Sequence, residues 1–208
     1  MPKGVRERLL EQAKKFHKWQ ETTYPGKTTE EIGGVWEVDY PDWNDTYYAF
    51  CHVLNKMDAE TADNILLNEM LYLIARDNDC ESLIHETTLH TNWFERLCRF
   101  VITSNENEAK WQFAAYLPEC QCSQEAKDLI LDFANDPHEY VSRRALMVMP
   151  DLRPDCVRNL PHSSGNEIVI QQNCNNTSVL QFSCGWIPFI PVCYHNIWNG
   201  QKRMVEAI

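Results

Sequence analysis

The feature that most constrains the fold is an internal repeat, because a segment in the middle of the chain recurs 32 positions later. Residues 108–119 align with residues 140–151. Both copies have a small or β-branched residue at the second position, an apolar pair near the end, and then a proline followed by an acid. Each copy is predicted to be a helix that ends at its proline, because the ring disrupts the helical hydrogen bonds behind it. Repeated helical units of this length stack and bury a shared core.

A turn motif precedes the second copy. The apolar segment 129–134 is followed by Asn-Asp-Pro at 135–137 and then by a helix that opens with Glu139, an acid near the positive end of the helix dipole. This arrangement resembles a HEAT repeat of the bacterial type: a helix, a tight turn with Asp and Pro, and a second helix that begins with Val and Arg and carries Ala in its middle. The residues that match this pattern are Asp136, Pro137, Val141, Arg143 or Arg144, and Ala145.

The resemblance is closest over residues 123–152, weaker over 92–119 and weakest over 60–89. It implies an all-α fold, a short solenoid in which antiparallel helix pairs form a right-handed stack. It also implies a family that consists mostly of binding scaffolds. The recognisable pattern stops after Pro154.

Helical periodicity also extends to the start of the chain. Apolar residues recur at steps of three and four through the first predicted helix, at 5–21, which Pro25-Gly26 stops. Further helices are predicted at 59–75, 83–89, 92–103, 106–117, 123–134 and 139–149. Their short loops indicate antiparallel neighbours. No run approaches the roughly 18–20 apolar residues of a membrane helix. The charged N-terminus has no signal-peptide core, so we expect a cytoplasmic protein.

Composition divides the chain into two predicted regions. Residues 1–160 form a helical HEAT-like domain with a basic leading helix (1–27), an aromatic and acidic loop (28–48) and helix pairs (58–155). Residues 161–208 form an atypical apolar C-terminal cap or tail. Since a repeat array needs a polar terminal cap, this segment either folds over the last helix pair, meets a partner, or associates with a second copy of the chain. An altered C-terminus is a further alternative.

Charge is distributed unevenly, with a formal net charge of −11 for the whole chain. The first 27 residues carry seven bases and three acids, whereas residues 28–160 carry ten bases and 25 acids. Phosphate contacts supply most of the affinity for nucleic acid, so this acidic body disfavours a nucleic-acid partner. An acidic surface instead accelerates association with a basic protein. We therefore expect a protein partner with a basic surface, and no membrane.

The predicted loop at 28–48 is the candidate partner-binding site. It is dense in rings and carboxylates, and the candidate residues are Trp36, Asp39, Tyr40, Asp42, Trp43 and Asp45. In one interpretation the rings pin the loop to the helices while Asp42 or Asn44 caps the next helix. In the other, the rings are exposed anchors surrounded by acids, and they bind the basic partner.

The chain has no motif for nucleophilic catalysis, phosphate binding or zinc-dependent hydrolysis, so we predict no catalytic residue and no cofactor. Asp77-Asn-Asp79 begins like a calcium loop but lacks the glycine and the final glutamate, which favours a solvated turn. His85 and His90 would lie about 140° apart on a helix. Cys120-Gln-Cys122 has no second ligand pair downstream. We therefore expect no metal site, and cysteines that remain thiols.

Two functions follow. The leading prediction is a non-enzymatic protein-binding scaffold, in concrete form an immunity- or antitoxin-type inhibitor that covers a basic toxin. The alternative is a HEAT-like DNA glycosylase acting on modified bases, because certain HEAT-like proteins are glycosylases that use Trp and Asp on a concave, basic face. The residues that would line such a nucleic-acid groove are Trp93, Trp111, Arg143 and Arg144. Arginines at these two positions more often pair with acids of the preceding helix.

Overall fold

The computed structural model describes residues 4–27, 32, 36–154, 157–159 and 168–170. In the described part of residues 4–154 every regular element is helical, in agreement with the predicted all-α class. The helices are α1 (Val5–Thr23), α3 (Trp36–Asp39), α4 (Trp43–Lys56), the 3-10 turn η1 (Ala59–Thr61), α5 (Asn64–Arg76), α6 (Ser82–Thr88), α7 (Thr91–Val101), α8 (Asn107–Tyr116), α9 (Gln124–Lys127), α10 (Ile130–Ala134) and α11 (Glu139–Leu152).

The chain divides into two compact units, Met1–Val157 and Arg158–Ile208. Two short strands, β1 (Val157–Asn159) and β2 (Ile168–Ile170), pair in a two-stranded sheet. Apart from β2, the apolar segment predicted at 161–208 lies outside the described residues, so its role as cap, partner contact or self-association surface stays a prediction. Among the described residues, no helix has the length and apolar character needed to cross a membrane.

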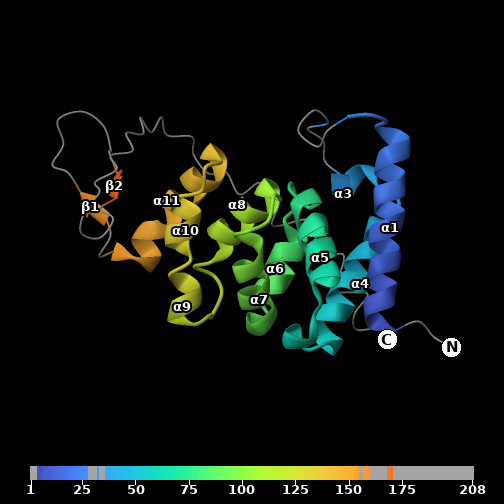
Figure 1. The fold of residues 1–208 in the computed structure, drawn as a ribbon, viewed down its shortest axis with the longest axis horizontal. Coiled ribbons are helices and arrows are strands. Elements are labelled where there is room, and N and C mark those ends of the chain that lie inside the picture. The colour runs from blue at the N-terminus through green and yellow to red at the C-terminus, as the bar shows by residue number, and fades with distance from the viewer. Residues whose placement is uncertain (1–3, 28–31, 33–35, 155–156, 160–167, 171–208) are drawn as a thin grey trace, which may run out of the picture. The chain divides into compact units, whose positions relative to one another are not determined.

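In the first unit, most packing is between helices that lie two to four elements apart in the sequence (Figure 1). One series of contacts joins α1 to α5, α5 to α8, and α8 to α11. A second series joins α4 to α6, α6 to α7, and α7 to α9. Contacts of α1 with α4, of α5 with α6 and α7, and of α8 with α6 and α7 connect the two series, and α10 packs on α8 and α11. Most packing is therefore between near neighbours in the chain.

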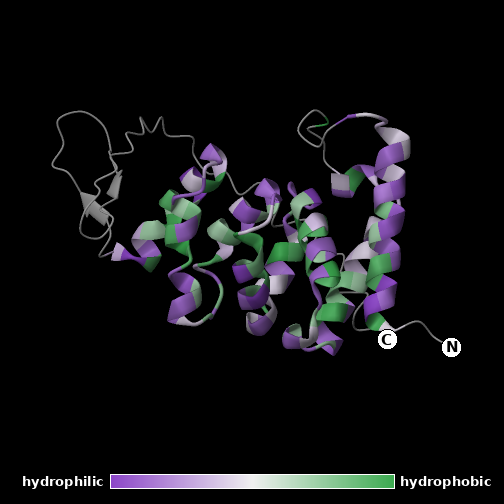
Figure 2. Cartoon of the chain, in the orientation of Figure 1, coloured by the Kyte–Doolittle hydropathy of each residue, from purple (hydrophilic) through white to green (hydrophobic). Residues whose placement is uncertain are grey.

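A continuous apolar core fills the space between these helices. The largest fully buried side chains are spread over many elements and include Phe16, Phe50, Phe94, Phe113 and Phe133. Figure 2 shows that most of the helices carry both hydrophobic and hydrophilic residues, as expected of amphipathic helices that share a core. Burial of each such ring contributes about 1.5–3 kcal/mol to folding relative to leaving it exposed. The apolar side chains that recur periodically in the sequence thus make the contacts that hold neighbouring helices together.

The two repeat prolines act differently. Helix α8 ends at Tyr116, just before Pro118, as predicted. The prediction that Pro150 ends the second copy is wrong, because Pro150 lies inside α11, which continues to Leu152. The ring removes only one backbone donor, and the N–H of Arg153 still donates to the carbonyl of Met149 at 2.7 Å. The last turn of α11 therefore forms around the proline.

Candidate functional site

Aromatic side chains from α1, α3 and α4 form one cluster around Phe16. The ring of Phe16 has its centroid 6.4 Å from that of Trp36, 4.9 Å from Tyr40 and 5.7 Å from Trp43. Trp36 and Tyr40 are each only 4 % exposed, and Trp43 is half-buried. The hypothesis that Trp36 and Tyr40 are exposed anchors is therefore wrong. Their rings belong to the core, where tilted and edge-to-face contacts stabilise them.

Burial of these rings also explains why much of the predicted loop is helical. Residues 28–31 and 33–35 lie outside the described residues, but α3 begins at Trp36 and α4 at Trp43. The N–H of Tyr40 donates to the carbonyl of Trp36 at 2.9 Å. Positions 36 and 40 are spaced by four residues, so the single turn of α3 brings both rings to one side, whereas Trp43 begins a separate helix. That spacing was the available signal for a helix.

The acids between these rings point outward. Asp39, Asp42 and Asp45 are exposed. Asp39 accepts a hydrogen bond from the hydroxyl of Tyr24 at 3.4 Å. Burial raises the pKa of Tyr40, and the nearby carboxylates of Asp42 and Asp45 raise it further. Both acids therefore lie close to the same buried ring.

The predicted cap is absent at the start of α4. Asp42 occupies the N-cap position, but its side chain makes no capping hydrogen bond; its backbone carbonyl accepts from the N–H of Thr46 instead. Two large apolar side chains on α3 and α4 are exposed, Val38 by 68 % and Tyr48 by 52 %. We call Val38, Asp39, Asp42, Asp45 and Tyr48 the acidic corner. It combines carboxylates with exposed apolar area.

Many acids elsewhere in the described residues have a cationic partner. Arg76 pairs with Glu106, and Lys110 pairs with Asp136 at 2.8 Å with both side chains nine-tenths buried. More exposed pairs are Arg6–Asp63, His17–Glu69, Arg99–Glu95, Arg153–Asp128 and Arg143–Glu139. Within the part of the chain that the structure describes, no cation lies within ion-pair distance of Asp42 or Asp45.

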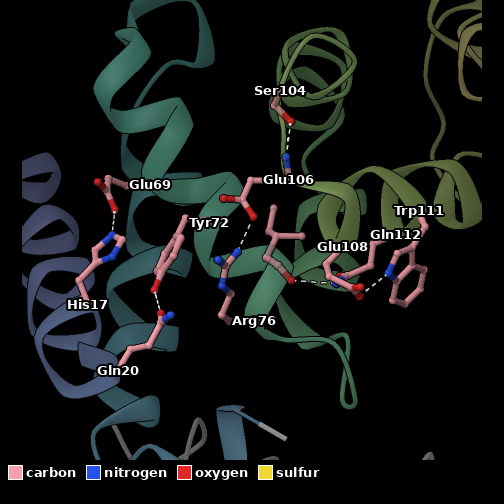
Figure 3. A network of polar contacts seen from close by, with 11 residues as sticks. His17, Gln20, Glu69, Tyr72, Arg76, Ser104, Glu106, Glu108, Trp111 and Gln112 are labelled. Atoms are coloured by element: carbon pink, nitrogen blue, oxygen red, sulfur yellow. Dashed lines mark hydrogen bonds and ion pairs between the residues drawn. The ribbon is translucent and has the colours of Figure 1, made fainter. Parts of the chain in front are cut away.

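A polar network centred on Arg76 links α1 to α5 and to the start of α8 (Figure 3). His17 stacks on Tyr72 with ring centroids 3.9 Å apart, and its Nε2 lies 3.0 Å from a carboxylate oxygen of Glu69. The hydroxyl of Tyr72 donates to Gln20. The guanidinium of Arg76 lies 4.0 Å from the centre of the Tyr72 ring. We call this set, with Glu106, the Arg76 network.

The Arg76 network was not identified as a functional site from the sequence. Its signal was the spacing of Tyr72 and Arg76, which puts them on one face of α5. Arg76 is only 7 % exposed, and Gln112, on α8, is fully buried. Gln112 donates to the carbonyl of Ile74 at 2.8 Å. These polar side chains hold α5 to α8, so their placement depends on helix packing.

The residues proposed for a nucleic-acid groove divide into two places. Trp111 is 4 % exposed and donates to Glu108 at 2.7 Å, and the guanidinium of Arg144 lies 5.0 Å from its ring centre. Tyr140 joins this group, because its ring contacts Trp111 and lies 5.0 Å from the guanidinium of Arg143. Trp93 is 3 % exposed and donates instead to the carbonyl of Met57 at 3.2 Å. The structure therefore brings three of the four residues together.

The turn that resembles a calcium loop is not solvated at its first residue. Asp77 is fully buried, and its carboxylate accepts from the N–H of Leu83 at 2.5 Å. Burial raises the pKa of Asp77 to about 7, and the nearby charge of Glu37 adds to the effect. The prediction of a solvated turn is wrong for this residue, because packing of α3 and α6 against the turn excludes water. No local pattern in the sequence predicts that Glu37 lies beside Asp77.

Possible metal ligands occur beside this turn. One oxygen of Glu37, one of Asp79 and the sulfur of Cys80 all lie within 4.8 Å of one another. The cysteines that the structure describes, Cys51, Cys80, Cys98, Cys120 and Cys122, are thiols. Burial raises the pKa of Cys120 to about 12 and that of Cys51 to about 11, so both stay protonated at neutral pH.

No protein-family model, curated protein or solved structure matches this chain. The HEAT resemblance therefore stays a prediction that rests on residues 60–152. Function has to be argued from the geometry and charge of the described residues.

Proposed function

We propose that this chain is a non-enzymatic protein-binding scaffold, built as a short HEAT-like solenoid of antiparallel helix pairs. The packing of each helix on near neighbours in the sequence supports a repeat arrangement. The Asp-Pro turn supports it further. One oxygen of Asp136 accepts from the N–H of His138 at 2.8 Å, while the other pairs with Lys110 of α8. The turn of one helix pair is thereby joined to the preceding repeat copy.

The acidic corner is the proposed binding surface, and its partner is a protein with a basic surface. The observation that carries this proposal is the state of its carboxylates: Asp39, Asp42 and Asp45 are exposed, and Asp42 and Asp45 have no cationic partner in the described residues. Acids of this kind steer a basic partner and raise its association rate. An immunity- or antitoxin-type inhibitor of a basic toxin is the concrete form.

The apolar contacts of this surface differ from those expected from sequence. Since Trp36 and Tyr40 are buried, the apolar contact area comes from Val38, Tyr48 and the exposed part of Trp43. The buried rings support this surface from below and fix the positions of α3 and α4. A preorganised surface loses less conformational entropy on binding.

The test compares two triple variants with the same change in charge. The site variant carries Asp39→Asn, Asp42→Asn and Asp45→Asn. The control carries Glu60→Gln, Glu125→Gln and Asp132→Asn, which replace exposed acids on other elements. Partners are captured from the native host with the wild-type chain, and their association rates are measured against salt concentration. We expect a basic partner whose association at low salt is slowed by the site variant and much less by the control.

Equal slowing by both variants would mean that only the total charge matters, and no slowing by the site variant would contradict the proposed surface.

The DNA-glycosylase alternative rests on the contact between Arg144 and Trp111. A flipped base needs an accessible ring to stack on, whereas Trp111 is 4 % exposed and its N–H is bonded to Glu108. We expect no retardation of duplex DNA at low salt. Tight binding that weakens with salt and is lost in Arg144→Ala would favour the glycosylase.

A further inference from the structure

The turn between α5 and α6 lies against α3 through an unusual set of side chains. Glu37 comes from α3, whereas Asp79 and Cys80 come from the turn, yet one ligand atom from each lies within 4.8 Å of the others. One oxygen of Glu37 accepts from the backbone N–H groups of Asp79 and Cys80, both at 2.9 Å. These bonds fix the carboxylate of Glu37 over the turn.

Two buried carboxylate oxygens at this place have no hydrogen-bond partner in the described structure. Glu37 is 6 % exposed, and its Oε2 is buried and unpartnered. Asp77 is fully buried, and its Oδ1 is also unpartnered. Burial of a polar group without a partner destabilises the fold, and more so when the group is charged. Both oxygens therefore lack the interaction that ordinarily compensates burial.

The negative charges around these two buried carboxylates make their burial still less favourable. The carboxylate of Glu37 acts on Asp77 as a neighbouring negative charge, and Asp79 acts in the same way on Glu81. In the described residues, no ion pair neutralises Glu37, Asp77 or Asp79. A cation bound between Glu37, Asp79 and Cys80 would place a positive charge beside these carboxylates.

We propose that Glu37, Asp79 and Cys80 bind a zinc-class divalent ion. Carboxylate oxygen and cysteine sulfur are both zinc ligands, and a sulfur donor disfavours magnesium and calcium, which take oxygen donors. Ligand atoms of a tetrahedral zinc site lie about 3.5 Å apart, so atoms that lie up to 4.8 Å apart would move closer when the ion binds. The thiol of Cys80 releases one proton as the sulfur–metal bond forms. Water completes the fourth position.

This site has a consequence for the acidic corner. Val38 and Asp39 directly follow Glu37 in α3, a helix of a single turn. Coordination of Glu37 would fasten α3 to the turn between α5 and α6 and would stabilise the folded chain by the free energy of metal binding. The zinc site stands on its own ligands and does not depend on the proposed partner.

The test uses the full chain, stripped of metal and kept reduced without chelating thiols. Bound Zn²⁺ is counted after equilibrium dialysis, and Co²⁺ reports sulfur ligation through its thiolate charge-transfer band. The variants are Cys80→Ser, Glu37→Gln and the exposed-site change Asp79→Asn. The control is Cys51→Ser, another half-buried thiol on α4.

We expect Cys80→Ser to lose one bound Zn²⁺ per chain, part of the cobalt–thiolate band and the rise in melting temperature on adding zinc. Asp79→Asn and Glu37→Gln should weaken zinc binding at least about tenfold, whereas Cys51→Ser should match the wild type. Circular dichroism checks that each variant is folded. If Glu37→Gln does not fold, Asp79→Asn alone tests whether the carboxylates are ligands. The proposal is overturned if Cys80→Ser and Asp79→Asn bind zinc like the wild type, or if Cys51→Ser loses the same ion.

Discussion

The acidic corner and the Arg76 network use similar residues in opposite ways. At the acidic corner the rings of Trp36 and Tyr40 are buried and the acids point to solvent. In the Arg76 network the ring of Tyr72 supports a guanidinium, which in turn pairs with Glu106. The carboxylate of Glu106 is therefore engaged within the fold, whereas those of the corner remain available to a partner.

The difference arises from where the cations lie. The sequence has no lysine or arginine between Lys27 and Lys56, so the acidic corner has no basic side chain of its own segment. Arg76 ends α5 and reaches Glu106, which precedes α8. An acidic side chain is a candidate contact for a partner when tertiary packing places no basic side chain beside it. The sequence neighbours of the acid do not reveal whether it is paired in this way.

The largest expected effect tests whether the corner rings belong to the core. Trp36→Ala should lower the free energy of unfolding by about 3–5 kcal/mol, because it empties a buried position against Phe16 and Tyr24. The control Val38→Ala, at a side chain that is 68 % exposed, should change it by less than about 0.5 kcal/mol. Urea denaturation of both variants measures this. Equal effects would show that α3 is not packed as described.

The Arg76 network gives the next largest effect. Arg76→Met should cost about 2–3 kcal/mol, because it leaves the part-buried carboxylate of Glu106 without its cation and removes the contact with Tyr72. The control is Arg143→Met, since the Arg143–Glu139 pair is exposed and worth about 0.5 kcal/mol or less. Chemical denaturation compares the two. A small loss for Arg76→Met would mean that this pair contributes little to holding α5 and α8.

Trp43 is intermediate between the buried rings of the core and the exposed side chains of the acidic corner, so its removal should have an intermediate effect on the free energy of unfolding. Its ring contacts Phe16 at 5.7 Å but is only half-buried, so Trp43→Ala should destabilise the chain by about 1–2 kcal/mol. If the acidic corner binds the partner, the variant should also dissociate faster, because aromatic anchors act mainly on dissociation. Binding kinetics on the folded fraction separate the two effects. Unchanged dissociation would assign Trp43 to the core alone.

The smallest expected effect on stability comes from a comparison of two aspartates that precede helices, Asp63 and Asp42. Asp63 caps α5 by accepting from the N–H of Leu66 at 2.9 Å, and this bond, with the neighbouring Arg6, lowers the pKa of Asp63. A lowered pKa means that its stabilisation is present above the unfolded value of about 3.9 and is lost as the pH falls through the folded value.

Asp63→Ala should therefore lower the melting temperature at pH 7, and the difference from wild type should vanish in acid. Asp42→Ala should leave the melting temperature nearly unchanged, because Asp42 makes no side-chain cap. Thermal melts across the acid range measure both variants. A clear loss of stability in Asp42→Ala would mean that the acids of the corner serve the fold, and it would weaken the proposed binding surface.

Periodicity and helix stop signals could be read from the sequence with fair accuracy. Helix α1 was expected at 5–21 and spans Val5–Thr23, and the segment expected at 139–149 became α11 at Glu139–Leu152. The error at Pro150 shows the limit of a local rule, since one missing donor does not end a helix whose next turn can still form. The helix expected at 123–134 is interrupted between α9 and α10 at Asp128 and Leu129, a break that no proline or glycine announced.

The sequence by itself determined the helical class and the acidic character of the body, because both depend on residue types and their local spacing. It also placed Asp39, Asp42 and Asp45 together, since they are close in the chain. Only the tertiary structure decided which rings are buried, that Arg76 reaches Glu106, and that Glu37 lies beside Asp79 and Cys80. These contacts join segments about 30–40 residues apart, and such contacts depend on how helices pack, which no local pattern in one sequence encodes.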